Sequence, residues 1–262
     1  MGISVYPINA LPYFQRVAEG LISGESLVHK FGRNPTTANG TWETVWTTSS
    51  LYTFQTAASS VEAISTSVND DATTATGANT ITVEGLDETW APASEVITMN
   101  GTSASTGTST TFIRIFRAYV TDVGTYQGAN AGTITIRDAS AGATRAIIAL
   151  DGANQLGQTQ MSMYTIPLGK VGYVRHWQVT VETTKGADFA FFQRQNADDA
   201  TTPFTAKRLL IYTEGVSSSL SSLDTDGPIG PFPAKTDLWW EVKASAANTE
   251  VTADFEIYLK NA

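Results

Sequence analysis

The segment Phe255-Glu256-Ile257-Tyr258-Leu259-Lys260 alternates apolar and polar side chains along its whole length. This period of two is typical of a β-strand with one face on a core and the other in solvent. The alternation recurs at residues 81–84, 96–99, 112–117 and 133–137, where β-branched and aromatic residues also favour strands. The sequence therefore predicts an all-β protein.

Turn-forming pairs such as Asn100-Gly101 and Asp151-Gly152 separate the alternating segments. The turns recur about every 8 to 15 residues, which fits a sandwich or a barrel and excludes βαβ units with their long helical runs. One stretch has a helical pattern: residues 11–21 place apolar side chains at spacings of three and four. Pro12 limits it to a short helix that begins there.

Side-chain composition divides the chain into three parts. Residues 1–40 are expected to form an extended N-terminal arm with a short helix, since residues 1–35 show no strand alternation. Residues 41–155 are rich in Thr and Ser, and residues 156–262 are rich in aromatic side chains. We expect these two parts to be antiparallel β-sandwiches of the jelly-roll-like kind, preceded by the arm.

The composition excludes several classes of protein. The chain has 262 residues, with 16% charged positions, a formal net charge of −9 and no cysteine. The missing cysteine excludes disulfides, Cys-ligated metals and a cysteine nucleophile. Lys and Arg are scattered, which argues against a nucleic-acid partner. No segment approaches the ~18 apolar residues of a membrane span, so no membrane partner is expected. Ser and Thr together account for 60 residues, which predicts a neutral, hydroxyl-rich surface.

Residues suited to catalysis are sparse. His29 and His176 have no second histidine or cysteine at metal-ligand spacing, and no nucleophile or phosphate-binding motif occurs. Two carboxylates on a β scaffold can hydrolyse a glycoside, but nothing in the sequence brings two of them together. The candidate acids are Glu43, Glu84, Glu95, Asp237 and Glu241. The sequence therefore predicts no enzyme, no catalytic residue, no metal and no cofactor.

Trp239 and Trp240, together with Trp177, could form a platform on which a sugar stacks. Neighbouring residues of a strand face opposite sides, so at most one of the adjacent pair can point into a given site. Packing in a core or against another subunit is the favoured interpretation of these tryptophans.

Several motifs together resemble a family of virion structural proteins of tailed bacteriophages, over most of the chain from Gly24 onward. The most specific is His29-Lys30-Phe31-Gly32-Arg33-Asn34, within residues 24–35. The weaker matches are Glu43-Thr44-Val45-Trp46, Gly85-Leu86-Asp87, the run from Ile97 to Thr102, the run from Tyr164 to Tyr173, and Lys235-Thr236-Asp237-Leu238.

The resemblance implies a non-enzymatic component of the virion, assembled in the host cytoplasm. The leading hypothesis is a capsid cement or decoration protein that binds and stabilises the lattice of the major capsid protein. Its partners would be the major capsid protein or other virion subunits, and the geometry of icosahedral lattices favours a homotrimer. The alternatives are a tail or tail-fibre component that contacts the host surface, and a carbohydrate-binding module.

The arm either docks on a neighbouring subunit or caps its own domain, since it has no core of its own. If it docks, aromatic and basic side chains are the expected anchors. The predicted partner-binding residues are Phe14, His29, Lys30, Phe31, Arg33 and Asn34.

Overall fold

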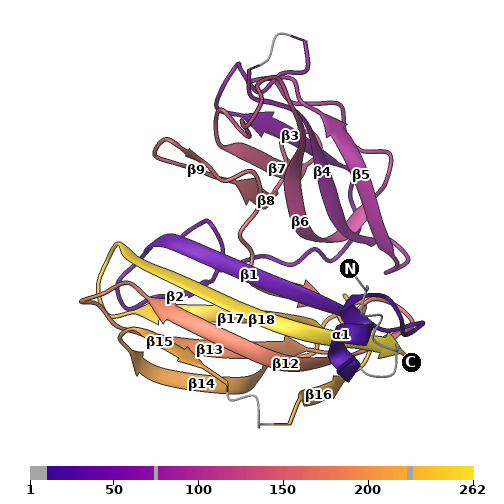
Figure 1. Cartoon of the computed structure of the whole chain (residues 1–262), viewed down its shortest axis with the longest axis vertical. Helices are drawn as coiled ribbons and strands as arrows, with labels where there is room; N and C mark the ends of the chain where they lie inside the picture. Colours follow the sequence, from indigo (N-terminus) through magenta and orange to yellow (C-terminus); the bar gives the residue numbers. More distant parts are fainter. Residues whose placement is uncertain (1–10, 74–75, 223–226) are drawn as a thin grey trace, which may run out of the picture.

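The computed structural model describes residues 11–73, 76–222 and 227–262. The named strands all pair antiparallel, so the all-β antiparallel class is confirmed. Figure 1 shows two lobes, a large one that holds both the first and the last strands of the chain and a small one above it. The described part of the chain contains no helix long and apolar enough to cross a membrane.

The large lobe consists of two facing sheets. The first contains β1 (Ser26–Thr37), β18 (Thr249–Asn261) and β12 (Lys170–Val181) in this order, with β15 (Ser219–Ser221) and β16 (Ile229–Phe232) on the free side of β12. The second contains β11 (Met163–Thr165) and β2 (Trp42–Thr44) beside β17 (Asp237–Ala244), followed by β13 (Ala187–Arg194) and β14 (Arg208–Val216).

The core of the large lobe lies between these two sheets. The alternation that defines β18 buries Phe255, whose ring lies 5.1 Å from that of Phe191 on the facing sheet. Phe191 in turn packs against Trp240 at 4.9 Å, and Trp240 is fully buried. The preference for packing over a sugar platform is confirmed, because Trp239 is also only 4% exposed.

The small lobe contains two three-stranded sheets and a short hairpin. One sheet is formed by β3 (Val61–Ser65), β7 (Ile134–Asp138) and β8 (Thr144–Ile148), and the other by β5 (Pro92–Thr98), β4 (Ala78–Asp87) and β6 (Phe112–Val123). The hairpin is β9 (Leu150–Asp151) with β10 (Asn154–Gln155). Buried isoleucines from both sheets share one apolar cluster with Trp46, Met163 and Trp239 of the large lobe, so the two lobes are packed together.

The expected arm at residues 1–40 requires a correction. Residues 1–10 lie outside the described residues, but residues 26–37 form the twelve-residue strand β1, paired with β18. The sequence concealed this strand because Lys30, Gly32 and Asn34 occupy its inward positions. A Cβ added at Gly32 would lie under 3.0 Å from the backbone of Val45 and Ser162, so no apolar side chain fits there.

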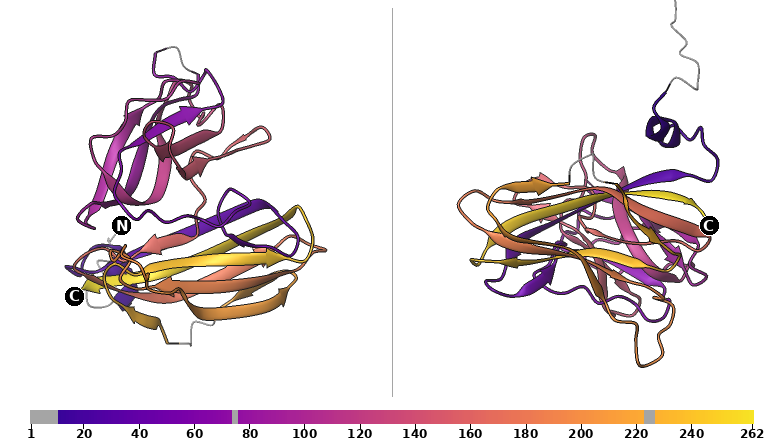
Figure 2. Two further views of the ribbon diagram at one scale, coloured as in Figure 1. Left: turned by 180° about the vertical axis from the view of Figure 1, so that it is seen from behind. Right: turned by 90° about the horizontal axis from the view of Figure 1, so that it is seen from below.

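The helical pattern at residues 11–21 does form a short helix, α1 (Tyr13–Ala18). Its Phe14 ring lies 5.7 Å from the Tyr258 ring on β18 and 3.4 Å from the Arg175 guanidinium on β12. The Tyr13 hydroxyl lies 3.0 Å from the Tyr258 hydroxyl. From below, Figure 2 shows α1 standing at the edge of the large lobe, beside the start of β1. The described part of the N-terminal segment therefore caps its own lobe.

Strand pairing groups residues 26–44 with residues 163–261, whereas the boundaries expected from the sequence, after residues 40 and 155, divide them among three parts. The small lobe is thus an insertion between β2 and β11, connected through residues 45–60 and 156–162. Where the two connections cross, the Ser162 amide donates a hydrogen bond to the Val45 carbonyl over 3.0 Å. Pairing between the first and last strands is a long-range contact that local composition does not reveal.

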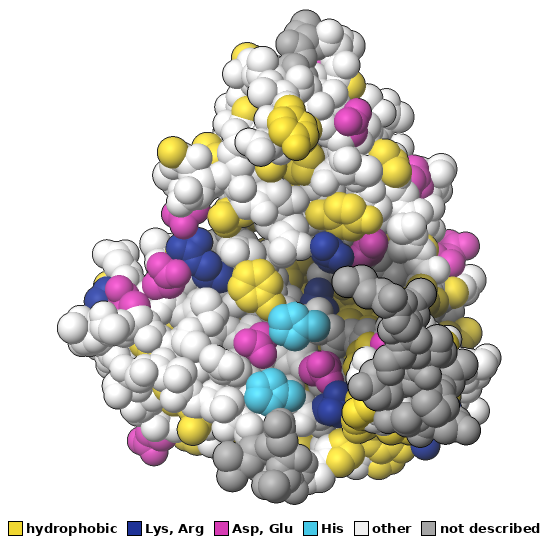
Figure 3. All heavy atoms as spheres, viewed as in Figure 1, with side chains coloured by type: hydrophobic (Ala, Val, Ile, Leu, Met, Phe, Trp, Pro, Cys, Tyr) yellow, Lys and Arg dark blue, Asp and Glu magenta, His cyan; other side chains and the backbone are white. Residues whose placement is uncertain are grey.

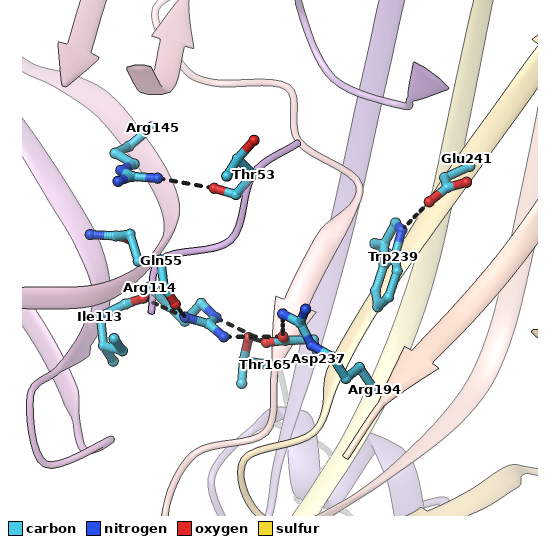
Figure 4. Close-up of polar contacts among 10 residues, drawn as sticks. All are labelled: Thr53, Gln55, Ile113, Arg114, Arg145, Thr165, Arg194, Asp237, Trp239 and Glu241. Carbon is cyan, nitrogen blue, oxygen red and sulfur yellow. Dashed lines mark hydrogen bonds and ion pairs between the residues drawn. The ribbon is translucent and has the colours of Figure 1, made fainter. Parts of the chain in front are cut away.

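A buried ion cluster fastens the small lobe to the large one (Figure 4). Arg114 on β6 makes a bidentate pair with Asp237 on β17, at 2.9 and 3.0 Å, and their side chains are 2% and 0% exposed. Asp237 also accepts hydrogen bonds from Thr165 and Arg194, each over 2.6 Å. Arg114 is buried because the large lobe covers its side of β6.

Aromatic rings enclose this cluster. The Arg114 guanidinium lies 4.9 Å from the centroid of the Trp90 ring and 5.2 Å from that of Phe54. Its remaining amino group donates to the backbone carbonyls of Gln55 and Ile113, each over 2.7 Å. A buried guanidinium needs such partners for its donors, and here each nitrogen has one. The junction thus fixes the position of the small lobe above β1.

Candidate functional site

The motif that carries the family resemblance lies in the middle of β1, and its residues alternate between two faces. His29, Phe31 and Arg33 stand opposite polar residues of β18 and share the outer face of the sheet. Lys30 and Asn34 stand opposite Phe255 and Val251, and are buried. The six predicted partner-binding residues therefore do not form one surface.

On the outer face, the two histidines of the chain flank one carboxylate. His29 Nε2 lies 3.8 Å from Asp254 Oδ1, and the two side chains are 64% and 28% exposed. His176 Nδ1, on β12, lies 3.2 Å from the Ser222 hydroxyl. Partial burial raises the pKa of Asp254, and the nearby histidines act in the opposite direction. Figure 3 shows both imidazole rings on the same exposed face, with acidic side chains beside them.

Arg33 and Phe14 are engaged within the chain. Arg33 pairs with Glu250 on β18 over 2.7 Å and with Asp151 of the β9–β10 hairpin over 3.0 Å, so it ties this hairpin to the sheet. Phe14 packs on Tyr258 and Arg175, as described above. Among the outward residues of the motif, His29 is exposed and Phe31 half-buried. All six partner contacts stay predictions.

Asn34 stabilises the connection from β1 to β2. Its side-chain amide donates to Glu43 over 2.8 Å, and its carbonyl oxygen accepts from the Thr36 amide over 3.1 Å. Glu43, only 2% exposed, also accepts from the Ala38 amide. The Glu43 carboxylate is thus used to hold a turn.

The other candidate acids lie in separate environments. Asp237 belongs to the ion cluster between the lobes, and Glu241 pairs with Lys207 over 2.8 Å. Glu95 accepts the backbone amides of residues 109 and 110. Glu84 lies beside a cavity near Lys30. Among the described residues, no three His, Asp or Glu side chains converge on a metal-binding position.

The inward side of β1 borders a cavity of about 510 Å³ between the lobes. The walls come from β1, β4, β5 and β6, together with Tyr164 of β11. Lys30 is 7% exposed, and its amino group donates to the Phe116 carbonyl. Burial lowers the pKa of Lys30 to about 7, and the nearby Arg117 acts in the same direction. In the sequence, Lys30 was notable only as part of the motif at residues 29–34. Its burial could not be predicted there, because it depends on the small lobe packing over β1.

Comparisons with known proteins do not assign the chain to a family. No family model matches it, and no curated protein matches it in sequence. Among solved structures, it aligns with a chain of infectious bursal disease virus, Gx strain, at 9% identity and a TM-score of 0.24, over 95% of this chain and 78% of that one. A chain of the Gt strain aligns at 8% identity and a TM-score of 0.20, over 96% and 82%. Scores this low do not establish a shared fold.

Proposed function

We propose that the protein is a virion structural component that decorates a capsid, binding and stabilising the lattice of the major capsid protein. The observation that carries the proposal is the open outer face of the sheet formed by β1, β18 and β12. His29 and Phe31, from the motif that resembles phage virion proteins, lie on this face with Asp254 and His176. A face with aromatic, basic and acidic groups beside a hydroxyl-rich surface suits a polar, non-obligate interface.

The joined lobes support the same proposal. A protein present in many copies must hold one shape so that each copy meets its neighbours in the same geometry. The buried Arg114–Asp237 pair and the apolar cluster shared between the lobes supply that rigidity. We further propose that both lobes belong to the jelly-roll-like sandwich class and that the chain forms a homotrimer; the two facing sheets of the large lobe support the first point.

The experiment is a count of the protein in purified particles, combined with rebinding. Particles that lack the protein should take up hundreds of copies of the added chain and resist heat or osmotic shock better afterwards. Phe31→Ser should weaken rebinding. The matched control, Tyr126→Ser, removes an aromatic ring that is 91% exposed on the small lobe, and should bind normally. Equal rebinding by both variants would exclude the outer face of β1 as the contact.

Copy number also separates the alternative locations. A tail or tail-fibre component should occur in tens of copies per particle, and it should not change the heat resistance of the capsid. The carbohydrate-binding alternative has lost its expected platform, because Trp239 and Trp240 are buried. Glycan binding by the isolated chain would require another site.

A further inference from the structure

The cavity between β1 and the small lobe combines an apolar wall with buried positive charge. Its apolar side includes Leu86, Phe116 and Tyr164, which are 0%, 9% and 7% exposed, and the Phe116 and Tyr164 rings lie 4.4 Å apart. Lys30 and Arg117 also line it. Cavities of this volume that mix apolar walls with a few polar groups are typical ligand sites.

Lys30 has no direct ion-pair partner among the described residues, although the charge of the nearby Glu84 acts to raise its pKa. Among the described residues, no carboxylate oxygen lies within 4.0 Å of its amino group, and the bond to the Phe116 carbonyl uses one of its three donors. Arg117 also lines the cavity, and its Nη2 donates to the uncharged Gln158 over 3.0 Å. A buried cation without a partner is unfavourable, because burial removes its hydration and nothing replaces it.

The charges that face the cavity select the kind of anion. When Lys30 is protonated, it and the exposed Arg117 contribute two positive groups and Glu84 one negative group, and His29 and the Tyr164 phenol also line the cavity. One negative charge therefore balances the site, whereas a doubly charged phosphate would also meet Glu84. The apolar wall favours an anion that carries a hydrophobic group.

We propose that this cavity binds a carboxylate attached to an apolar group, with Lys30 as its ion-pair partner and the Phe116–Tyr164 ring pair as its apolar wall. The carboxylate belongs either to a small organic acid or to an acidic side chain of a protein partner. The inference concerns the isolated chain and does not rest on the proposed capsid function.

Calorimetric titration with three probes tests the proposal: hexanoate, its neutral counterpart hexanamide, and N-acetylglutamate α-amide, which presents a glutamate side chain. At about pH 8.5, Lys30 is mostly neutral and becomes charged beside a bound carboxylate, so binding should take up close to one proton. Comparing buffers of different ionisation enthalpy measures this uptake. The uptake should decrease towards about pH 6, where Lys30 is already protonated, and should persist in His29→Asn.

Variants of two lysines give the matched comparison. Lys30→Met should weaken hexanoate binding at least tenfold and abolish proton uptake. Lys207→Met, at a half-exposed lysine paired with Glu241, should leave both unchanged. If Lys30→Met does not fold, the same point is tested on the unaltered chain, where hexanoate should slow the reductive methylation of Lys30 but not that of Lys207.

The outcomes distinguish a small organic acid from an acidic side chain of a partner, and they also show when the proposal fails. Tighter binding of hexanoate indicates a small acid, and binding of the glutamate probe alone indicates a partner side chain. Equal affinity for hexanamide and hexanoate, unchanged affinity in Lys30→Met, or no binding of either carboxylate at millimolar concentration would overturn the proposal. None of these results depends on whether the chain decorates a capsid.

Discussion

Replacing Asp237 by Asn tests whether the buried ion cluster holds the two lobes together. Asn has nearly the same shape, so the variant removes the charge and leaves packing intact. Arg114, at 2% exposure, then stays buried without its carboxylate, and Thr165 and Arg194 lose a charged acceptor. The change therefore acts at one point where four strands meet: β6, β11, β13 and β17.

The expected loss in the free energy of unfolding follows from the burial of this pair. Removing one partner of a buried ion pair costs about 3–5 kcal/mol, because the remaining charge is left without compensation. Arg194→Met should cost less, about 1–2 kcal/mol, since its side chain is 29% exposed and Asp237 keeps its bidentate partner. Glu182→Gln, in the exposed pair with Lys185, should cost far less than Asp237→Asn, because solvent screens an exposed ion pair.

Denaturant unfolding, followed by tryptophan fluorescence and by circular dichroism, gives the three free energies. The two signals should give one transition for the unaltered chain, and two transitions in Asp237→Asn would show that the lobes had become uncoupled. A loss below about 1 kcal/mol for Asp237→Asn, no larger than that for Glu182→Gln, would refute the reasoning.

Three further predictions follow from the core and from β1. Gly32→Ala should destabilise the chain by about 1–3 kcal/mol, because rigid backbone occupies the space that the added Cβ needs. Gly227→Ala is the control, since no atom of the described residues lies within 4 Å of a Cβ added there, and equal stability of the two variants would contradict the close approach at Gly32. Trp239→Ala and Trp240→Ala should each cost about 3–5 kcal/mol in chemical denaturation; unchanged stability would show that the rings are not packed. Lys30→Met should stabilise the chain by up to about 5 kcal/mol at about pH 6, since burial lowers the Lys30 pKa from 10.5 to about 7. Between these two pKa values the unfolded chain binds the extra proton, so the unaltered protein gains stability as pH rises and the advantage of the variant should shrink. A gain that stays constant from about pH 6 to about pH 10 would rule out the buried amine.

Much of the strand content was predictable because alternation is a local signal. The alternating segments at residues 81–84, 112–117 and 255–260 lie within β4, β6 and β18. β1 was not predicted because Lys30, Gly32 and Asn34 occupy its inward positions, where an apolar side chain would have marked a strand. These residues are buried by segments distant in the sequence.

For the candidate site, the sequence determined the residue types and supplied the motif at residues 29–34. It did not predict β1, so the shared face of His29, Phe31 and Arg33 became evident only from the strand itself, in which side-chain direction alternates with position. Only the tertiary structure decided that the first and last strands pair, that Arg114 is buried against Asp237, and that Lys30 borders a cavity. Each of these depends on contact between segments at least 86 residues apart, and the last two depend on contact between the two lobes. The local sequence pattern does not show which distant segment will cover a polar side chain and exclude water from it. For Lys30 that segment is β6 of the small lobe, and the resulting burial lowers the pKa of its amino group.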